Sequence, residues 1–146
     1  MKAIIILLLI GLAFSYNTTA AVEYAEAHWD NYNKEYNDYS ETNGEDANFV
    51  AQCLIAGGLD LKGCSTDDKG SFASSKSLST CLTIKGWKSS KAKPKGFKAG
   101  YPMLIGSHAV IANQVTNEDV SFCSHNFDAC DRSLSGLVAT ITYYYL

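Results

Sequence analysis

The chain lacks an excess of positive charge, a second long apolar run, internal repeats and any Cys-x-x-Cys pair. It has 12 basic and 15 acidic residues, a formal net charge of −3, which argues against nucleic acid as a partner. No segment beyond the N-terminus is apolar enough to cross a bilayer, so we expect no membrane span. Without a Cys-x-x-Cys pair, a structural zinc site of the usual spacing is not expected.

The one long apolar run lies at the N-terminus and has the pattern of a secretory signal peptide. Lys2 supplies the positive start, residues 4–12 the apolar core, and Ala13-Phe14-Ser15 a small-x-small cleavage site. We therefore expect residues 1–15 to be removed and residues 16–146 to form one extracellular domain with one core. Removal of Lys2 makes the net charge slightly more negative.

The five cysteines are odd in number, and secretion permits disulfides. Their spacing favours Cys123–Cys130 as a local pair and Cys64–Cys81 as a loop staple, although the sequence leaves the connectivity open. Cys53 would then be a buried free thiol or form an intermolecular bond, which would make the protein self-associate.

Asn17-Thr18-Thr19 is the one Asn-x-Ser/Thr acceptor sequence in the chain. It lies at the start of the predicted mature protein, where a glycan would be accessible. The alternative is that Asn17 or Thr18 caps the following helix by accepting a backbone N–H of its first turn.

Apolar periodicity and turn residues predict three helices, over residues 19–32, 46–56 and 75–85. The first has an apolar stripe at helical spacing, made of Ala21, Ala25, Trp29 and Tyr32. The second buries Phe49, Val50, Cys53 and Leu54. A Tyr- and Asn-rich loop over residues 31–43 joins these two helices.

The C-terminal third predicts strands over residues 101–105, 109–115, 120–124 and 137–145, with a polar loop at 125–135. Helices first and an antiparallel sheet after them define the α+β class.

Residues 85–98 hold six lysines around Trp87, Pro94 and Phe97. This segment is either a cationic patch for an anionic polymer, such as a cell-wall glycan, or a solvated connector. We favour the connector, because Pro, Gly and Ser oppose a helix that would align the charges.

Residues 44–53 read Gly-Glu-Asp-Ala-Asn-Phe-Val-Ala-Gln-Cys. This segment resembles the Gly-Asp-Cys-Thr/Ala-Asn-Phe-Val-Ser-Gln-Cys signature of the putative amidase domain family. Residues 16–25 and 124–134 resemble the opening and the ending of the same family. The resemblance implies a papain-like, NlpC/P60-like fold, in which N-terminal helices pack on a C-terminal antiparallel sheet.

The resemblance also implies a site that needs a thiolate at a helix start, a histidine at a strand start and a residue that orients the histidine. Aligned on the Asn-Phe-Val core, the nucleophile's position falls on Asp46. A register one residue later gives Ala47, which also supplies no thiol. His108 would be the base and His125 its orienting partner.

The ligand cleft that the family would place around this site involves Asn48, Gln52, Trp87 and Ser107. Three roles are open to Asp46: a helix cap, an ion pair with His108, or one ligand of a divalent metal shared with His108 and His125. The cap is favoured, and no cofactor is expected.

These observations favour a catalytically inactive amidase-fold protein that binds a peptide or peptidoglycan-like ligand, or is a structural component outside the cell. A carboxylate cannot replace the thiolate, because it is the weaker nucleophile and would form an anhydride that is far less accessible than a thioester. The alternative is an active cell-wall or peptide amidase that uses a non-classical nucleophile or a metal.

Overall fold

The computed structural model describes residues 15–146. The predicted signal peptide, apart from Ser15, therefore lies outside the described residues, and its removal stays a prediction.

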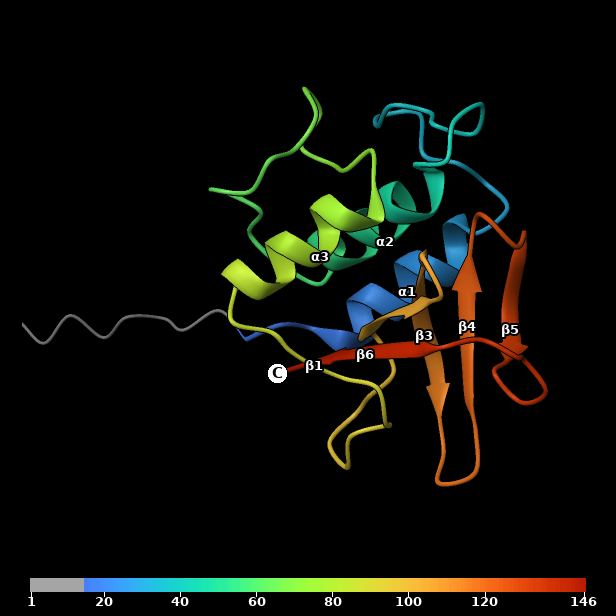
Figure 1. Cartoon of the computed structure of the whole chain (residues 1–146). Coiled ribbons are helices and arrows are strands. Elements are labelled where there is room, and N and C mark those ends of the chain that lie inside the picture. Colours follow the sequence, from blue (N-terminus) through green and yellow to red (C-terminus); the bar gives the residue numbers. More distant parts are fainter. Residues whose placement is uncertain (1–14) are drawn as a thin grey trace, which may run out of the picture.

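The described chain has three helices followed by six strands (Figure 1). The helices are α1 (Thr18–His28), α2 (Glu45–Ala56) and α3 (Ser75–Ile84). The strands are β1 (Lys88–Ser90), β2 (Pro102–Ile105), β3 (His108–Val115), β4 (Val120–Ser124), β5 (Ala129–Ser133) and β6 (Ile141–Tyr145). This order confirms the predicted α+β class.

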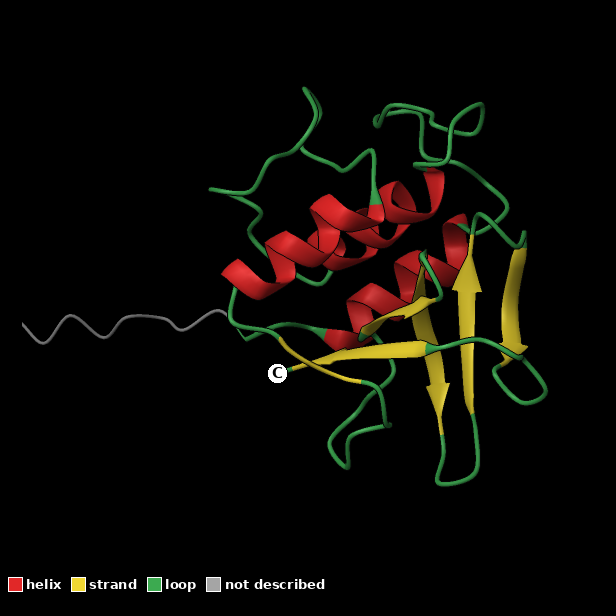
Figure 2. Ribbon diagram, in the orientation of Figure 1, coloured by secondary structure: helices red, strands yellow, loops and turns green. Residues whose placement is uncertain are grey.

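The strands form one antiparallel sheet in the order β1-β6-β2-β3-β4-β5. In Figure 2, β6 lies nearly horizontal, whereas β3, β4 and β5 lie nearly vertical. The sheet is therefore strongly twisted from one edge to the other. Both α1 and α2 contact β3, and α3 packs against α2. The sheet and α1 thus enclose α2, which becomes the centre of the core.

The structure corrects three element predictions. Helix α1 ends at His28 rather than at residue 32, because the chain turns there and Asn31 N–H bonds the His28 carbonyl. The predicted polar loop at 125–135 contains β5, which pairs with β4. The last strand starts only at Ile141, and short β1 pairs with it from within the lysine-rich segment.

Residues 45–54 of α2 are all buried. The predicted apolar face of Phe49, Val50, Cys53 and Leu54 is confirmed, and each of these side chains has no exposed surface. The same helix also buries Glu45, Asp46, Asn48 and Gln52. Burial of four polar side chains costs free energy unless each finds partners, and those partners define the site below.

Both predicted disulfides are present. Cys64–Cys81 joins the loop after α2 to α3, and Cys123–Cys130 joins β4 to β5. Cys53 is the one free cysteine in residues 15–146, and it is fully buried in α2. An intermolecular bond through Cys53 is therefore incompatible with the folded chain, and the self-association that it would cause is not supported.

The lysine-rich segment 85–98 forms no helix, in line with the connector interpretation. Its two aromatic residues, Trp87 and Phe97, are buried and contact the Tyr101 ring edge-on. The lysines Lys88, Lys91, Lys93, Lys95 and Lys98 are exposed.

Gly100 lies where the chain entering β2 meets the start of α1. Its φ is +90°, and a Cβ atom there would lie 2.6 Å from the Thr18 carbonyl oxygen. Because Gly100→Ala combines backbone strain with a backbone clash, we expect it to lower the free energy of unfolding by about 2–4 kcal/mol in urea titrations.

Gly136→Ala is the matched control, since Gly136 also has positive φ but a Cβ atom added there would have no neighbour within 4 Å. It should cost only about 1 kcal/mol. Equal losses in the two variants would contradict the close approach of α1 to Gly100.

Candidate functional site

Asp46 lies in the first turn of α2 and is not its N-cap residue, although its Oδ1 accepts from the Ala47 backbone N–H of that turn at 2.7 Å. Gly44 is the N-cap and makes no side-chain cap bond. A side chain at Gly44 would clash with the Ala73 backbone, which explains why a larger capping residue does not stand there. The cap prediction for Asp46 is therefore wrong, although its carboxylate still lies at the positive end of the helix dipole.

The Asp46 carboxylate faces the start of β3. Its Oδ2 accepts from the Ala109 backbone N–H at 3.1 Å and lies 3.2 Å from His108 Nδ1. The Asp46 side chain is 3% exposed, whereas the His108 side chain is 45% exposed. The structure thus pairs the Asp46 side chain with His108, as in the second of the three roles considered, and leaves the rest of the imidazole open to solvent.

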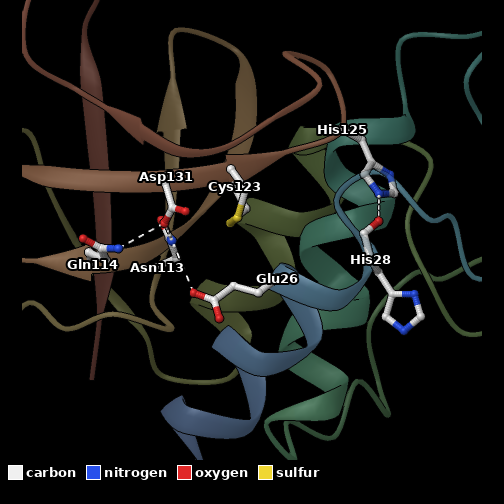
Figure 3. The surroundings of a disulfide bond; sticks show 8 residues. Glu26, His28, Asn113, Gln114, Cys123, His125 and Asp131 are labelled. Atoms are coloured by element: carbon white, nitrogen blue, oxygen red, sulfur yellow. Dashed lines mark hydrogen bonds between the residues drawn. A yellow bond between two sulfur atoms is a disulfide. The ribbon is translucent and has the colours of Figure 1, made fainter.

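His125 does not orient His108. Its Nδ1 lies 2.7 Å from Glu45 Oε1, and its Nε2 lies 2.8 Å from the His28 carbonyl oxygen. Figure 3 shows the His125 ring directed at that carbonyl, while the His28 ring points away. With both ring nitrogens engaged elsewhere, the predicted partnership of His125 with His108 is wrong.

Glu45 also accepts two hydrogen bonds through its other oxygen. Glu45 Oε2 accepts from the Tyr39 backbone N–H at 2.7 Å and from Asn48 Nδ2 at 3.1 Å. The His28 carbonyl only accepts, so His125 Nε2 carries a proton and donates to it. His125 is also stacked between two rings, those of Tyr32 and Phe49, with centroids 3.7 and 4.0 Å away.

A shared metal site at Asp46, His108 and His125 is not supported. In residues 15–146, no group of three or more His, Cys, Asp or Glu side chains has the arrangement to hold a metal ion. The two histidines instead pair with two successive carboxylates of α2, Asp46 and Glu45, which project in different directions.

Of the four predicted cleft residues, two line a cavity and two do not. Asn48 and Gln52 line a cavity of about 60 Å³ between α2 and the loop after α1. Trp87 is 5% exposed and packs edge-on against Tyr16 and Tyr101, so it is a core residue and its assignment to the cleft is wrong. Ser107 is exposed in the turn before β3 and does not line this cavity.

The loop that covers this cavity is held by hydrogen bonds to residues 67 and 68. Tyr39 O–H donates to Asp67 Oδ2 at 2.7 Å, and Asn37 Nδ2 donates to Asp68 Oδ1 at 2.6 Å. Burial would raise the pKa of the Asp67 carboxyl, but hydrogen bonds from the Ser71 backbone and the Tyr39 hydroxyl outweigh it and hold that pKa below its usual value.

Tyr24 joins two residues that line the cavity, Gln52 and Asn33. Its O–H donates to Gln52 Oε1 at 2.7 Å and accepts from Asn33 Nδ2 at 3.0 Å. Burial raises the pKa of Tyr24 to about 12, so the hydroxyl stays protonated and keeps this donor role.

No thiol can replace Asp46 as a nucleophile. Cys53 lies seven residues further along α2, roughly 10 Å along the axis, and has no exposed surface. Burial raises the pKa of its thiol well above the usual value. The arrangement around Asp46 and His108 can hold charge and offer hydrogen bonds, but it has no reactive thiolate.

The role of Glu45 was not predicted from the sequence. The sequence feature that could have indicated this role is a second acidic residue, Glu45, beside Asp46 at the start of the predicted helix. Nothing in the linear pattern connected Glu45 with His125, because the two residues are 80 positions apart.

Similarity to known proteins identifies the family of this chain. A model of the putative amidase domain family matches residues 15–101, and the chain belongs to this family. The matched residues include Asp46 and end before His108.

The chain is similar to the uncharacterized protein YhbB of Bacillus subtilis (strain 168). It is 35% identical over 74 residues, which cover 51% of this chain and 23% of the relative. The chain thus spans less than a quarter of that protein's length. No solved structure matches the chain. In residues 15–146, no helix is both long and apolar enough to cross a membrane.

Glu45→Ala should destabilise the fold strongly. It leaves the Tyr39 N–H, the Asn48 amide and His125 Nδ1 without their partner in a buried place, so we expect a loss of about 3–5 kcal/mol in the free energy of unfolding. The exposed Glu41 gives the matched control, and Glu41→Ala should change that free energy by less than about 0.5 kcal/mol. A small loss in both variants would contradict the structural role of the Glu45–His125 pair.

Cys53 should be unreactive until the chain unfolds. Without reductant, Ellman's reagent should detect no thiol in the native protein and a single thiol in denaturant, because the sulfur is buried and its pKa is raised. Cys53→Ala should abolish the signal in denaturant. Rapid reaction of the native protein would show that a thiol is accessible and would reopen cysteine catalysis.

Proposed function

We propose that this chain is a catalytically inactive amidase-domain protein of the extracellular space, which keeps a papain-like, NlpC/P60-like scaffold for binding a peptide or peptidoglycan-like ligand. The observation that carries the proposal is the Asp46–His108 pair. An acidic side chain in the first turn of a buried helix faces an imidazole at the start of a strand, 3.2 Å away.

This is the arrangement that a cysteine amidase needs, with a carboxylate in place of the thiol. The dipole of α2 and the nearby imidazole would lower the pKa of a thiol at residue 46. A partly exposed imidazole could then transfer its proton to the leaving amine. The family signature has cysteine at the position where this chain has Asp46.

Asp46 cannot supply the missing chemistry. Its attack on an amide carbonyl would break the C–N bond and form an acyl anhydride, in which the carboxylate is a better leaving group than the amine being expelled. Its Oδ2 is also occupied by the Ala109 N–H and by His108. Its Oδ1 accepts from the Ala47 N–H, so both oxygens already accept backbone hydrogen bonds that oppose their attack on a carbonyl carbon.

The extracellular location is supported by the two disulfides, which form and persist in oxidising compartments. Asn17 is exposed and caps α1, since its Oδ1 accepts from the Ala20 backbone N–H at 3.0 Å. A glycan on Asn17 would attach through Nδ2 and would leave this oxygen free to cap the helix.

The test is to restore the thiol. Mature protein and an Asp46→Cys variant are incubated with peptidoglycan, and soluble products are identified by mass spectrometry. We expect products from Asp46→Cys and none from the unchanged protein. In Asp46→Cys/His108→Ala, product formation should fall by about 10²–10⁴-fold, the usual contribution of a general acid–base group.

Products from the unchanged protein that disappear in His108→Ala would overturn the inactive assignment and favour an amidase with a non-classical nucleophile. Products from neither protein, with Asp46→Cys folded and its new thiol titratable, would contradict the descent of this site from a peptidoglycan amidase.

A further inference from the structure

Arg132 is the one arginine of the chain, and its side chain is exposed on β5. Within residues 15–146, the contacts between basic and acidic side chains are those of the two histidines, so Arg132 has no carboxylate partner. A guanidinium carries five N–H donors and keeps its positive charge in proteins. This part of the surface therefore presents a fixed positive group whose charge no neighbouring acid pairs.

An aromatic ring, rather than an acid, holds Arg132 in place. Its Cζ lies 5.1 Å from the centroid of the Phe127 ring, which is the geometry of a cation–π contact. The Phe127 ring is edge-on to the His108 ring, with centroids 5.6 Å apart. It is also edge-on to the buried Phe122, which anchors it to the core. Arg132 and the imidazole of the candidate site thus contact the same ring.

The strand register also puts Arg132 and His108 on one face of the sheet. Phe122 of β4 lies opposite both Ala112 of β3 and Arg132 of β5, and opposite residues of paired strands point to the same side. His108 and Ala112 are four residues apart on β3, so strand alternation directs both to that side. The distances of 5.1 and 5.6 Å to the shared Phe127 ring limit the separation of Arg132 Cζ from the His108 ring centre to at most about 11 Å, which an extended peptide covers in about three residues.

The acids that are close to Arg132 in the sequence do not pair with it. Asp131 Oδ1 accepts from the side-chain amides of Asn113 and Gln114, and Figure 3 shows Asp131 directed at these two residues. Asp128, in the turn before β5, is exposed and forms no ion pair with Arg132. The guanidinium is therefore available to an anion that approaches along this face.

We propose that this face binds an acidic peptide, with one peptide unit against His108 and a carboxylate two or three residues away paired with Arg132. The planar guanidinium matches a carboxylate through two parallel hydrogen bonds, a geometry that an ammonium does not reproduce. The Phe127 ring fixes the guanidinium and offers an apolar surface to the residues between. The proposal rests on the proposed function for the peptide and its place at His108, whereas the preference for a carboxylate follows from Arg132.

The experiment is a titration of the intact, disulfide-bonded protein followed by NMR. As the one arginine, Arg132 gives a single Nε–H signal, and the His108 ring Cε1–H reports the other end of the path. The probes are acetyl-Glu-Ala-Ala-Ala-Glu-amide and acetyl-Gln-Ala-Ala-Ala-Gln-amide, which offer a carboxylate or a carboxamide to Arg132 in either chain direction. We expect both signals to shift together with the acidic probe, which should bind about three- to tenfold more tightly than the glutamine probe. The difference should shrink as salt is added.

Variants of exposed residues separate the guanidinium from general charge. Arg132→Gln should lower the affinity for the acidic probe to that for the glutamine probe. Arg132→Lys keeps the charge without the planar fork and should give an intermediate affinity. Lys76→Gln is the matched control, because it removes one positive charge from an exposed position on α3, away from β5 (Figure 1). It should bind both probes as the unchanged protein does.

Several results would overturn the proposal. Equal affinities of the unchanged protein for the two probes, or no shift of either signal, would exclude an acidic-peptide surface. A preference for the acidic probe that survives in Arg132→Gln would place the charge recognition elsewhere. Equal losses in Arg132→Gln and Lys76→Gln would show a general charge effect. A shift of the Arg132 signal without the His108 signal would separate the anion from the candidate site.

This test is independent of hydrolysis. Products from Asp46→Cys, without a preference for the acidic probe, would overturn the acidic-peptide surface alone. A preference that depends on Arg132, together with silence from Asp46→Cys, would contradict the amidase ancestry of the site and leave the acidic-peptide surface in place.

Discussion

The buried contact between Glu45 and His125 is the constraint on which the rest of the structure depends. It joins the start of α2 to the end of β4, and the other nitrogen of His125 holds the His28 carbonyl at the end of α1. Glu45 also fixes the covering loop through the Tyr39 N–H. One buried pair thus ties three separate segments to the first turn of α2, and a pair so buried is stable only because each polar atom has a partner.

The same turn of α2 also presents the neighbouring carboxylate to β3. Because Glu45 fixes the helix start and Gly44 lets it approach the Ala73 backbone, Asp46 is placed against the first residues of that strand. Its contact with His108 therefore follows from packing that Glu45 maintains. The fold thereby separates His108 and His125, which the family resemblance placed together. His125 has a structural role in the core, whereas His108 faces solvent.

Much of the fold could be predicted from the sequence because local patterns specified it. Apolar spacing placed α2 and α3 within a residue of their observed bounds, and β-branched runs placed β2, β3 and β4. The short edge strands β1 and β5 were not found, because their residues are polar and pair only when a neighbouring strand is already present. The end of α1 was also missed, because the apolar residues Trp29 and Tyr32 continue its stripe beyond the turn.

The sequence by itself determined the class, the family signature and the absence of cysteine at residue 46, because each depends on local order and spacing; it favoured the two disulfide pairs, and the structure established them. Only the tertiary structure decided the partners of the buried polar groups. It paired His125 with Glu45 rather than with His108, buried Trp87 away from the cleft and left one oxygen of Asn48 unpaired. The physical reason is that hydrogen bonds between residues far apart in the chain depend on direction and burial, which no local pattern encodes.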